Sequence, residues 1–293
     1  MELRRCILRQ PRYDYQANGS QQYDRDSFDK VNPEASGVEF CYFDVKLEPM
    51  TTVLATGHEA VCIFVNDQCD SEVLSQLQSL GVVRTLFDII TQLSLTYISL
   101  QKYIVLRCAG FNNVDLSTAS KLGFKVVNVP AYSPEAVAEF AVGMIMTVVR
   151  KYHKAYLRVR EGNFLLDGLV GFNLNGKTVG IVGTGKIGLL TGKILSKGFE
   201  CNVVAYDPYQ KNTAAAAEYG VSYVETLEEL LGQADIVSLH CPLNDKTKYI
   251  INEKTLGQTK KGVILVNTSR GALIDTGALI QFVSTFRDIS TAY

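Results

Sequence analysis

The chain has 293 residues, which is long enough for two domains. Its 29 Lys and Arg residues nearly balance 30 Asp and Glu residues, so the net charge of −1 argues against a nucleic-acid or membrane-surface partner. Hydrophobic residues make up 47% of the chain, and the seven cysteines are scattered without C-x-x-C pairs. This cysteine pattern is typical of reduced thiols. Because the first residues contain no long apolar run, we expect a cytoplasmic protein without a secretory signal or membrane span.

Strand and helix patterns alternate along the first half of the chain. Residues 1–30 are polar and predict an irregular segment. The residues that follow predict strands at 39–45, 61–65, 103–108 and 125–129 and helices at 71–80 and 115–122, the second capped by Asp115. A long helix should begin near Pro134, because proline is favoured in the first helical turn.

The second half continues the alternation. It predicts strands at 178–182, 202–206, 221–224, 235–240 and 263–267, with helices after Gly188, at 225–231, at 252–260 and from Asp275. Such alternation predicts an α/β fold with doubly wound parallel sheets and right-handed crossovers. In these sheets ligands bind beyond the carboxyl ends of the strands.

The strand at 178–182 leads directly into Gly183, Gly185 and Gly188, which are spaced as G-x-G-x-x-G. Gly183 permits a tight turn, Gly185 lets a pyrophosphate approach the main chain, and Gly188 lets the next helix pack closely on the strand. The free N–H groups at the start of that helix would bind the phosphates. The context of strand, loop and helix favours a dinucleotide site over a ligand-free turn.

Asp207 ends the next strand, about 20 residues beyond the glycine loop, where the dinucleotide-binding pattern places an acidic residue. A carboxylate there accepts hydrogen bonds from the adenosine ribose hydroxyls and repels a 2′-phosphate. The sequence therefore predicts NAD, rather than NADP, as the cofactor.

Seven segments carry a family resemblance. They are RCAGFNNVD (107–115), VPAYSPEAVAEFAV (129–142), VREGNF (159–164), GKTVGIVGTGKIG (176–188), AYDPY (205–209), LHCPL (239–243) and VNTSRGALID (266–275). In this order they resemble the D-isomer-specific 2-hydroxyacid dehydrogenases, with the nearest likeness in the D-lactate dehydrogenase branch. The likeness covers about residues 23–83 and 103–280.

This resemblance implies two domains with a cleft between them. A flavodoxin-like substrate domain would span residues 1–130, and a Rossmann NAD-binding domain would span residues 131–293. The implied reaction is hydride transfer from NADH to C2 of a 2-keto acid, with pyruvate and D-lactate as the favoured pair. A D-glycerate or hydroxypyruvate reductase is the sister alternative. The family also implies a homodimer.

The resemblance assigns roles to individual residues. Arg270 matches the arginine that binds the substrate carboxylate and carbonyl. Ala109 and Gly110 match residues whose backbone amides hold that carboxylate. Tyr132 matches a tyrosine that shapes the substrate pocket, and the alternative for it is a tyrosine at the edge of the core. The residues expected to contact the cofactor, besides the three glycines and Asp207, are Thr184, Lys186, Ile187, His240, Cys241, Pro242, Thr247, Thr268 and Ser269. For His240, a plain strand-end histidine is the alternative. No pair of His or Cys residues has the spacing of metal ligands, and His58 and His153 read as structural or solvated.

The chain departs from the family pattern in two places. The family's acid/base histidine and its partner glutamate follow the segment GALID, and this chain ends QFVSTFRDISTAY without either, so we expect a truncated second domain with little turnover. An NAD-binding remnant without catalysis is therefore another alternative. Residues 84–102 form an atypical insert, which is an extra surface helix, an oligomer contact or, as we favour, translated intron sequence. The intron hypothesis extends to 281–293, because Val283-Ser284 can be encoded by GTAAGT, a common splice sequence.

Overall fold

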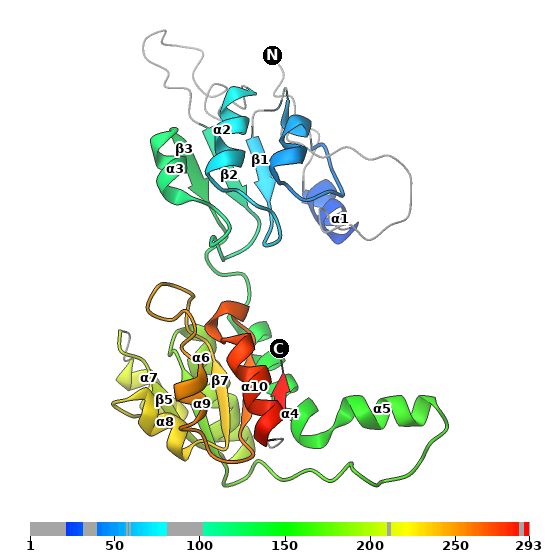
Figure 1. Cartoon of the computed structure of the whole chain (residues 1–293), viewed down its shortest axis with the longest axis vertical. Helices are drawn as coiled ribbons and strands as arrows, with labels where there is room; N and C mark the ends of the chain where they lie inside the picture. The colour runs from blue at the N-terminus through cyan, green and yellow to red at the C-terminus, as the bar shows by residue number, and fades with distance from the viewer. Residues whose placement is uncertain are drawn as a thin grey trace. The chain divides into compact units, whose positions relative to one another are not determined.

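The computed structural model describes residues 22–31, 40–56, 58, 60–80, 102–209, 212–286 and 290–292. It divides into two compact units, Met1–Tyr132 and Ser133–Tyr293. Each unit contains a parallel sheet with helices packed against it (Figure 1). The parallel α/β fold class predicted from the alternating pattern is therefore confirmed. The predicted insert at 84–102 lies outside the described residues, apart from Lys102.

The first unit is built on three parallel strands in the order β1-β2-β3. The strands are β1 (Ala60–Ile63), β2 (Lys102–Leu106) and β3 (Phe124–Val127), and the helices are α1 (Gln22–Val31), the 3-10 helix η2 (Pro49–Ala55), α2 (Ser71–Ser79) and α3 (Leu116–Lys121). The helix predicted at 71–80 is confirmed as α2, and its Val73, Leu74 and Leu77 are fully buried in the core that contains the strands. Asp70 and Asp115 cap α2 and α3 by accepting hydrogen bonds from backbone N–H groups in the first turn.

Two predictions for this unit are wrong. Residues 22–31 form helix α1 instead of an irregular segment, and residues 40–45 form no strand. Phe40 and Tyr42 alternate as strand residues would, but the ring of Phe40 stacks on Phe28 of α1 at 4.9 Å and on Tyr42 at 6.1 Å. The aromatic side chains of this segment therefore pack on a helix and on one another, a tertiary contact that local periodicity does not reveal.

The second unit contains six parallel strands in the order β6-β5-β4-β7-β8-β9. Their bounds are β4 (Thr178–Val182), β5 (Asn202–Tyr206), β6 (Val221–Tyr223), β7 (Ile236–Leu239), β8 (Ile264–Asn267) and β9 (Ser290–Ala292). In sequence rank this is 3-2-1-4-5-6, the strand order of a Rossmann domain. Strand β9 follows the helix predicted from Asp275; it pairs with β8 over Ile264↔Ser290 to Val266↔Ala292 and fills the sixth place.

Helices cover both faces of this sheet. They are α4 (Pro134–Arg150), α5 (Tyr152–Arg160), α6 (Lys186–Phe199), α7 (Thr213–Tyr219), α8 (Leu227–Gln233), α9 (Glu253–Leu256), the 3-10 helix η3 (Gly271–Leu273) and α10 (Thr276–Phe286). One core joins α4, α6 and α7 to strand residues such as Ile181, and the other joins α8, α9 and α10 to alternate residues such as Val237. Burial on both faces explains why β4, β7 and β8 are nearly continuous apolar runs.

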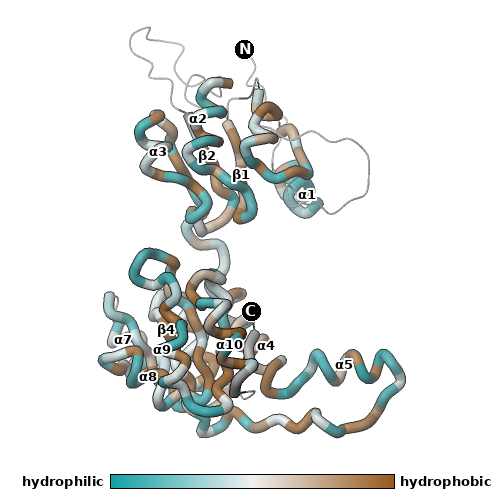
Figure 2. Tube along the Cα trace, in the orientation of Figure 1, coloured by the Kyte–Doolittle hydropathy of each residue, from teal (hydrophilic) through white to brown (hydrophobic). Residues whose placement is uncertain are grey.

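The predicted long helix from Pro134 is broken. It starts at Pro134 with Ser133 as its cap, and it ends where Lys151 adopts a left-handed backbone with φ of +53°. Helix α5 then projects from the unit and buries none of its residues (Figure 1). We call residues 152–170 the α5 arm; hydrophobic residues lie along it (Figure 2), and most of their side chains are exposed, Leu166 by 79% and Val170 by 81%. Across the described ranges, no helix has both the length and the apolar character needed to cross a membrane.

Candidate functional site

The polar residues expected to bind the cofactor follow adjacent strands of the six-stranded sheet. Gly183 follows β4, Asp207 follows β5, His240 follows β7 and Thr268 follows β8. All these strands are parallel, so the four positions share the carboxyl edge of the sheet. The chain leaves β4 toward β5 on one side and later returns to β7 on the other, and this reversal of strand order opens a ligand crevice at such an edge.

The three glycines of the loop differ in what surrounds them. Gly183 has a φ of +96°, and a Cβ there would lie 2.7 Å from the backbone nitrogen of Cys241. A Cβ on Gly188 would lie 2.1 Å from the carbonyl oxygen of Gly183. At Gly185 a Cβ meets no described atom within 4 Å. Gly183 and Gly188 are therefore required by packing, whereas Gly185 leaves open space beside the main chain, as a cradle for phosphates requires.

Helix α6 begins immediately after this open space. Gly185 is its N-cap and supplies no side-chain bond to the first turn. Lys186 is exposed and Ile187 is half-buried at the start of the helix. The first-turn N–H groups and the positive end of the helix dipole thus adjoin Gly185, which makes this helix start suited to an anionic pyrophosphate.

Asp207 is buried and holds the glycine loop. Its Oδ2 accepts hydrogen bonds from the backbone N–H of Thr184 at 2.8 Å and from the Thr184 hydroxyl at 3.1 Å. Its Oδ1 accepts one from the backbone N–H of Tyr209 at 2.9 Å. The side chain of Thr184 thus points to Asp207, and the carboxylate joins the end of β5 to the loop after β4. The contact of Asp207 with the ribose stays a prediction.

The segment after β7 lies against the glycine loop. Nε2 of His240 lies 2.9 Å from the Ser238 hydroxyl, and its Nδ1 is buried without a hydrogen-bond partner among the described residues. Burial lowers the pKa of His240 to about 4 and raises the pKa of Cys241 to about 11, so both side chains are neutral at pH 7. A buried ring nitrogen that lacks a partner is a candidate contact for a ligand at this edge.

Thr247 shapes the turn that follows Cys241. Its hydroxyl donates to the carbonyl oxygen of Pro242 at 2.6 Å and accepts from the backbone N–H of Asn244 at 2.8 Å. Pro242 itself is exposed, and Thr247 is buried. The contact of Thr247 with the cofactor stays a prediction. Within the structure, its hydroxyl closes this turn through hydrogen bonds.

Asn267, which the sequence analysis missed, organises the segment with Arg270. Its Oδ1 accepts from the backbone N–H of Ser269 at 3.0 Å, and its Nδ2 donates to the carbonyl oxygen of Arg270 at 2.9 Å. The Ser269 hydroxyl donates to the carbonyl oxygen of Leu239 at 3.0 Å, and Arg270 Nη1 donates to that of Ser269 at 3.2 Å. The sequence does contain an indication of this role, because Asn267 is a polar residue at the end of an otherwise apolar strand. Thr268 Oγ1 is buried and has no hydrogen-bond partner within the described part of the chain.

In the first unit, the loop after β2 carries Ala109 and Gly110. The carbonyl oxygen of Ala109 accepts from Asn128 Nδ2 at 2.8 Å, and that of Gly110 accepts from the Cys108 thiol at 3.2 Å. Among the described groups, none accepts a hydrogen bond from the backbone N–H of Ala109 or Gly110. These two amides are thus available to a carboxylate, although their role in binding stays a prediction.

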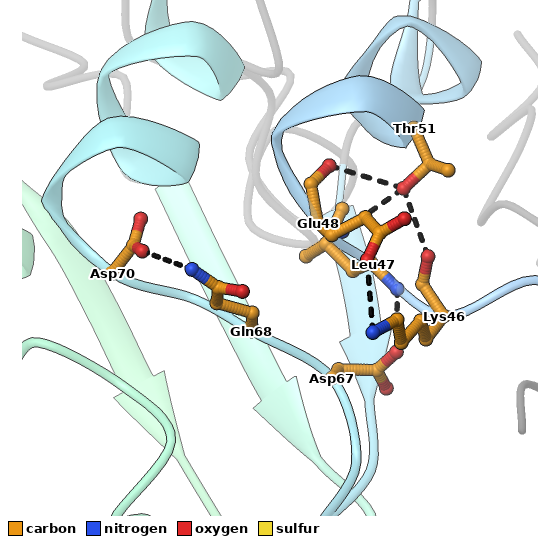
Figure 3. A network of polar contacts seen from close by, with 7 residues as sticks. All are labelled: Lys46, Leu47, Glu48, Thr51, Asp67, Gln68 and Asp70. Carbon is orange, nitrogen blue, oxygen red and sulfur yellow. Dashed lines mark hydrogen bonds and ion pairs between the residues drawn. The ribbon is translucent and has the colours of Figure 1, made fainter.

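A buried carboxylate supports this loop from the neighbouring strand end. Asp67 accepts from the backbone N–H of Leu47 at 2.6 Å and of Phe64 at 2.5 Å, and desolvation raises its pKa. Figure 3 shows Asp67 beside the residues at the start of η2, where the Thr51 hydroxyl accepts from Glu48 N–H at 2.9 Å. Asn113 Nδ2 donates to the carbonyl oxygens of Phe64 and Asp67, each at 2.8 Å. The loop after β2 is therefore tied to the loop after β1.

Arg107 adds a buried ion pair next to Ala109, and sequence analysis missed it as well. Its Nη2 lies 3.2 Å from Oδ2 of Asp24 in α1, and both side chains are about nine-tenths buried. Its guanidinium also lies over the ring of Phe64, 4.8 Å from the ring centre. The pair links residues 83 positions apart (107 − 24), which no local motif encodes.

Three residues considered in the sequence analysis remain: Tyr132, His58 and His153. Tyr132 ends the first unit and is 69% exposed, so its role in a pocket stays a prediction. His58 Nδ1 lies 2.9 Å from the carbonyl oxygen of Thr56, and His153 is exposed on α5. Within the described ranges, no group of three or more His, Cys, Asp or Glu residues is arranged to hold a metal ion.

Comparisons with known proteins bear on the cofactor and the reaction. The sequence profile of the D-isomer specific 2-hydroxyacid dehydrogenase NAD binding domain matches residues 142–289. D-lactate dehydrogenase of Escherichia coli (strain K12) is 50% identical over 262 residues, which are 89% of this chain and 72% of that protein. 2-Hydroxyacid dehydrogenase A of Aspergillus oryzae is 49% identical over 263 residues, 88% of this chain and 68% of that protein.

Solved structures agree with these relatives. The apo-structure of the Escherichia coli D-lactate dehydrogenase matches with a TM-score of 0.77 and 47% identity, covering 93% of this chain and 79% of that one. The Aquifex aeolicus D-lactate dehydrogenase, solved with NAD and lactic acid, matches with a TM-score of 0.75 and 28% identity, covering 93% of this chain and 74% of that one. The predicted resemblance and the NAD cofactor are confirmed: the chain belongs to the D-isomer specific 2-hydroxyacid dehydrogenases, a family of NAD-dependent oxidoreductases.

Proposed function

We propose that this chain interconverts pyruvate and D-lactate by hydride transfer with NAD. The observation that carries the proposal is the set of groups at the carboxyl edge of the six-stranded sheet: a glycine loop with open space at Gly185, the buried Asp207, and Arg270 held after β8. The choice of pyruvate and D-lactate within the family is supported by the D-lactate dehydrogenases among the relatives.

The residues present fit the dinucleotide. The cradle at Gly185 and the start of α6 would hold the pyrophosphate, and Asp207 would accept hydrogen bonds from the adenosine ribose. His240 Nδ1 and Thr268 Oγ1 are buried polar atoms without hydrogen-bond partners among the described residues, as expected at the wall of a polar ligand site. When bound, NADH supplies the hydride.

The substrate would be held by charge and by backbone amides. The planar guanidinium of Arg270 suits the carboxylate and the neighbouring keto oxygen of a 2-keto acid. It would also stabilise the negative charge that develops on that oxygen as the hydride is transferred. We assign the amides of Ala109 and Gly110 to the substrate carboxylate and Tyr132 to the selection of the substrate's side chain. A second copy of the chain covering the exposed α5 arm is the assembly we propose.

A second candidate is NAD binding without turnover. One observation favours it: the histidine at the carboxyl edge, His240, has a pKa of about 4 and therefore carries no extra proton to donate at pH 7. Reduction of a keto acid to a hydroxy acid requires a proton as well as a hydride, and a positioned general acid contributes about 10²–10⁴-fold to the rate. The two candidates differ in turnover, and NAD binding does not separate them.

The test is NADH consumption by the purified full chain with pyruvate, compared with hydroxypyruvate. We expect a higher kcat/KM for pyruvate. We also expect Arg270→Met to lower kcat/KM by about 10²–10³-fold, the cost of removing one donor to a developing oxyanion, while the Kd for NADH stays unchanged. Preference for hydroxypyruvate would replace the substrate assignment with the sister activity. Tight NADH binding without consumption of either substrate would establish the second candidate.

A further inference from the structure

Tyr223, the last residue of β6, reaches the glycine loop through its hydroxyl. The hydroxyl donates to Thr184 Oγ1 at 3.0 Å. Thr184 in turn donates to Oδ2 of Asp207 from both its hydroxyl and its backbone N–H. The three residues lie in or directly after β6, β4 and β5, which are neighbours in the sheet. A single chain of hydrogen bonds therefore spans three strands and ends on the carboxylate expected to face the ribose.

The direction of this chain follows from the chemistry of its members. A carboxylate only accepts hydrogen bonds, so the hydroxyl of Thr184 must give its single proton to Asp207. The oxygen of Thr184 then serves as the acceptor for Tyr223, as the geometry indicates. Tyr223 thus fixes the rotation of the Thr184 hydroxyl, and that hydroxyl fixes one side of the carboxylate.

The arrangement also distinguishes the two oxygens of Asp207. The N–H and the hydroxyl of Thr184 together supply two donors to Oδ2, which has two lone pairs. A ribose hydroxyl would therefore approach through Oδ1, the oxygen that also accepts from the Tyr209 N–H. If Thr184 turns away, the carboxylate can rotate and this difference between its oxygens is lost.

We propose that Tyr223 is a positioning residue for the adenosine-ribose end of NAD, acting through Thr184 on Asp207. The inference rests on the proposed role of Asp207 as the ribose acceptor. Tyr223 tightens NAD binding and increases discrimination against NADP, because a fixed carboxylate both accepts from the 2′-hydroxyl and repels a 2′-phosphate. It has no part in the chemistry at the nicotinamide.

The test measures Kd values on the full chain by fluorescence titration with NADH, NADPH and an NADH analogue that lacks the adenosine 2′-hydroxyl. Tyr223→Phe should raise the Kd for NADH by about three- to tenfold, the effect of one neutral hydrogen bond. The Kd for the 2′-deoxy analogue should stay unchanged, and the Kd for NADPH should not rise. Thr184→Val should reproduce this result, and Thr184→Ser, which keeps the hydroxyl, should bind NADH as the original chain does. Tyr219→Phe, which removes a tyrosine hydroxyl from α7, is the matched control and should leave all three values unchanged.

The outcomes separate this proposal from the one on which it rests. If Asp207→Ala weakens NADH binding and Tyr223→Phe does not, Asp207 keeps its role and the proposal for Tyr223 is overturned. If Asp207→Ala leaves the Kd for NADH unchanged, the ribose role itself fails, and the proposal for Tyr223 fails with it. Equal weakening of all three cofactors by Tyr223→Phe, with a lower Tm, would assign Tyr223 a structural role only and would also overturn the proposal.

Discussion

Two loops that carry predicted binding residues, one in each unit, are held in place by different physical means. The glycine loop after β4 is shaped by absent Cβ atoms and by hydrogen bonds to Asp207. The loop after β2 is held by contacts with distant parts of the sequence, among them the buried Arg107–Asp24 pair and the hydrogen bonds from Asn113 to the carbonyl oxygens of Phe64 and Asp67. The first is encoded within a few residues, and the second depends on packing between separate elements. A substitution in the glycine loop should therefore destabilise the chain through local strain and overpacking. A substitution that affects the loop after β2 should act through loss of a contact between distant residues.

Gly183→Ala should have the largest effect. The new Cβ would lie 2.7 Å from the backbone of Cys241 at a φ of +96°, so strain and overpacking add to about 3–5 kcal/mol of lost stability. Urea unfolding measures this loss. Gly185→Ala is the matched control, because its Cβ meets no described atom within 4 Å. It should change stability by less than about 1 kcal/mol yet weaken NADH binding. Equal stability of the two variants would show that packing does not dictate the spacing of the glycines.

Breaking the ion pair of the first unit should come next. Asp24→Leu leaves the Arg107 guanidinium buried beside an apolar residue, and removal of one partner from a buried pair costs about 3 kcal/mol or more. Combining it with Arg107→Met should restore most of that stability, since no buried charge then remains. The control is Asp26→Asn on the exposed side of α1, expected within about 0.5 kcal/mol of the original chain. The midpoint of urea unfolding gives all three values. A double variant no more stable than Asp24→Leu would contradict this account.

The same contrast explains what could be predicted from sequence. The strand at 178–182, the glycine loop and Asp207 were predictable because their signal lies in about 30 consecutive residues, and the structure places them together. Helix α1 was not, because its sequence QYDRDSFDKV is polar and it packs through Asp24 and Phe28 onto residues far along the chain. Tyr223 was not predicted for the same reason, because its partner Thr184 lies on another segment of the sheet edge. Asn267 differs, because its partners Ser269 and Arg270 are close in sequence. Local sequence patterns therefore predict the strands and the glycine loop. Polar contacts between residues far apart in the sequence are not visible in such patterns.

The smallest expected effect is the pH dependence of stability that His240 contributes to the second unit. Burial lowers the pKa of His240 from its ordinary 6.5 to about 4, so the folded chain keeps this ring neutral where the unfolded chain protonates it. The stability that depends on the neutral ring is complete above pH 6.5 and is lost as the pH falls toward 4. Between pH 7 and pH 5 the loss from this residue should be about 2 kcal/mol.

His240→Asn should remove that part of the pH dependence, while His153→Asn, on the exposed face of α5, should leave it intact. Urea unfolding of the three proteins at pH 5 and pH 7 measures the difference. Because the folded chain keeps the ring neutral until the pH approaches 4, a ligand contact to His240 Nδ1 should leave NADH binding to the folded chain unchanged between pH 7 and pH 5. A pH dependence that is identical in the original chain and in His240→Asn would show that the ring is solvated, and His240 would then be a plain strand-end histidine.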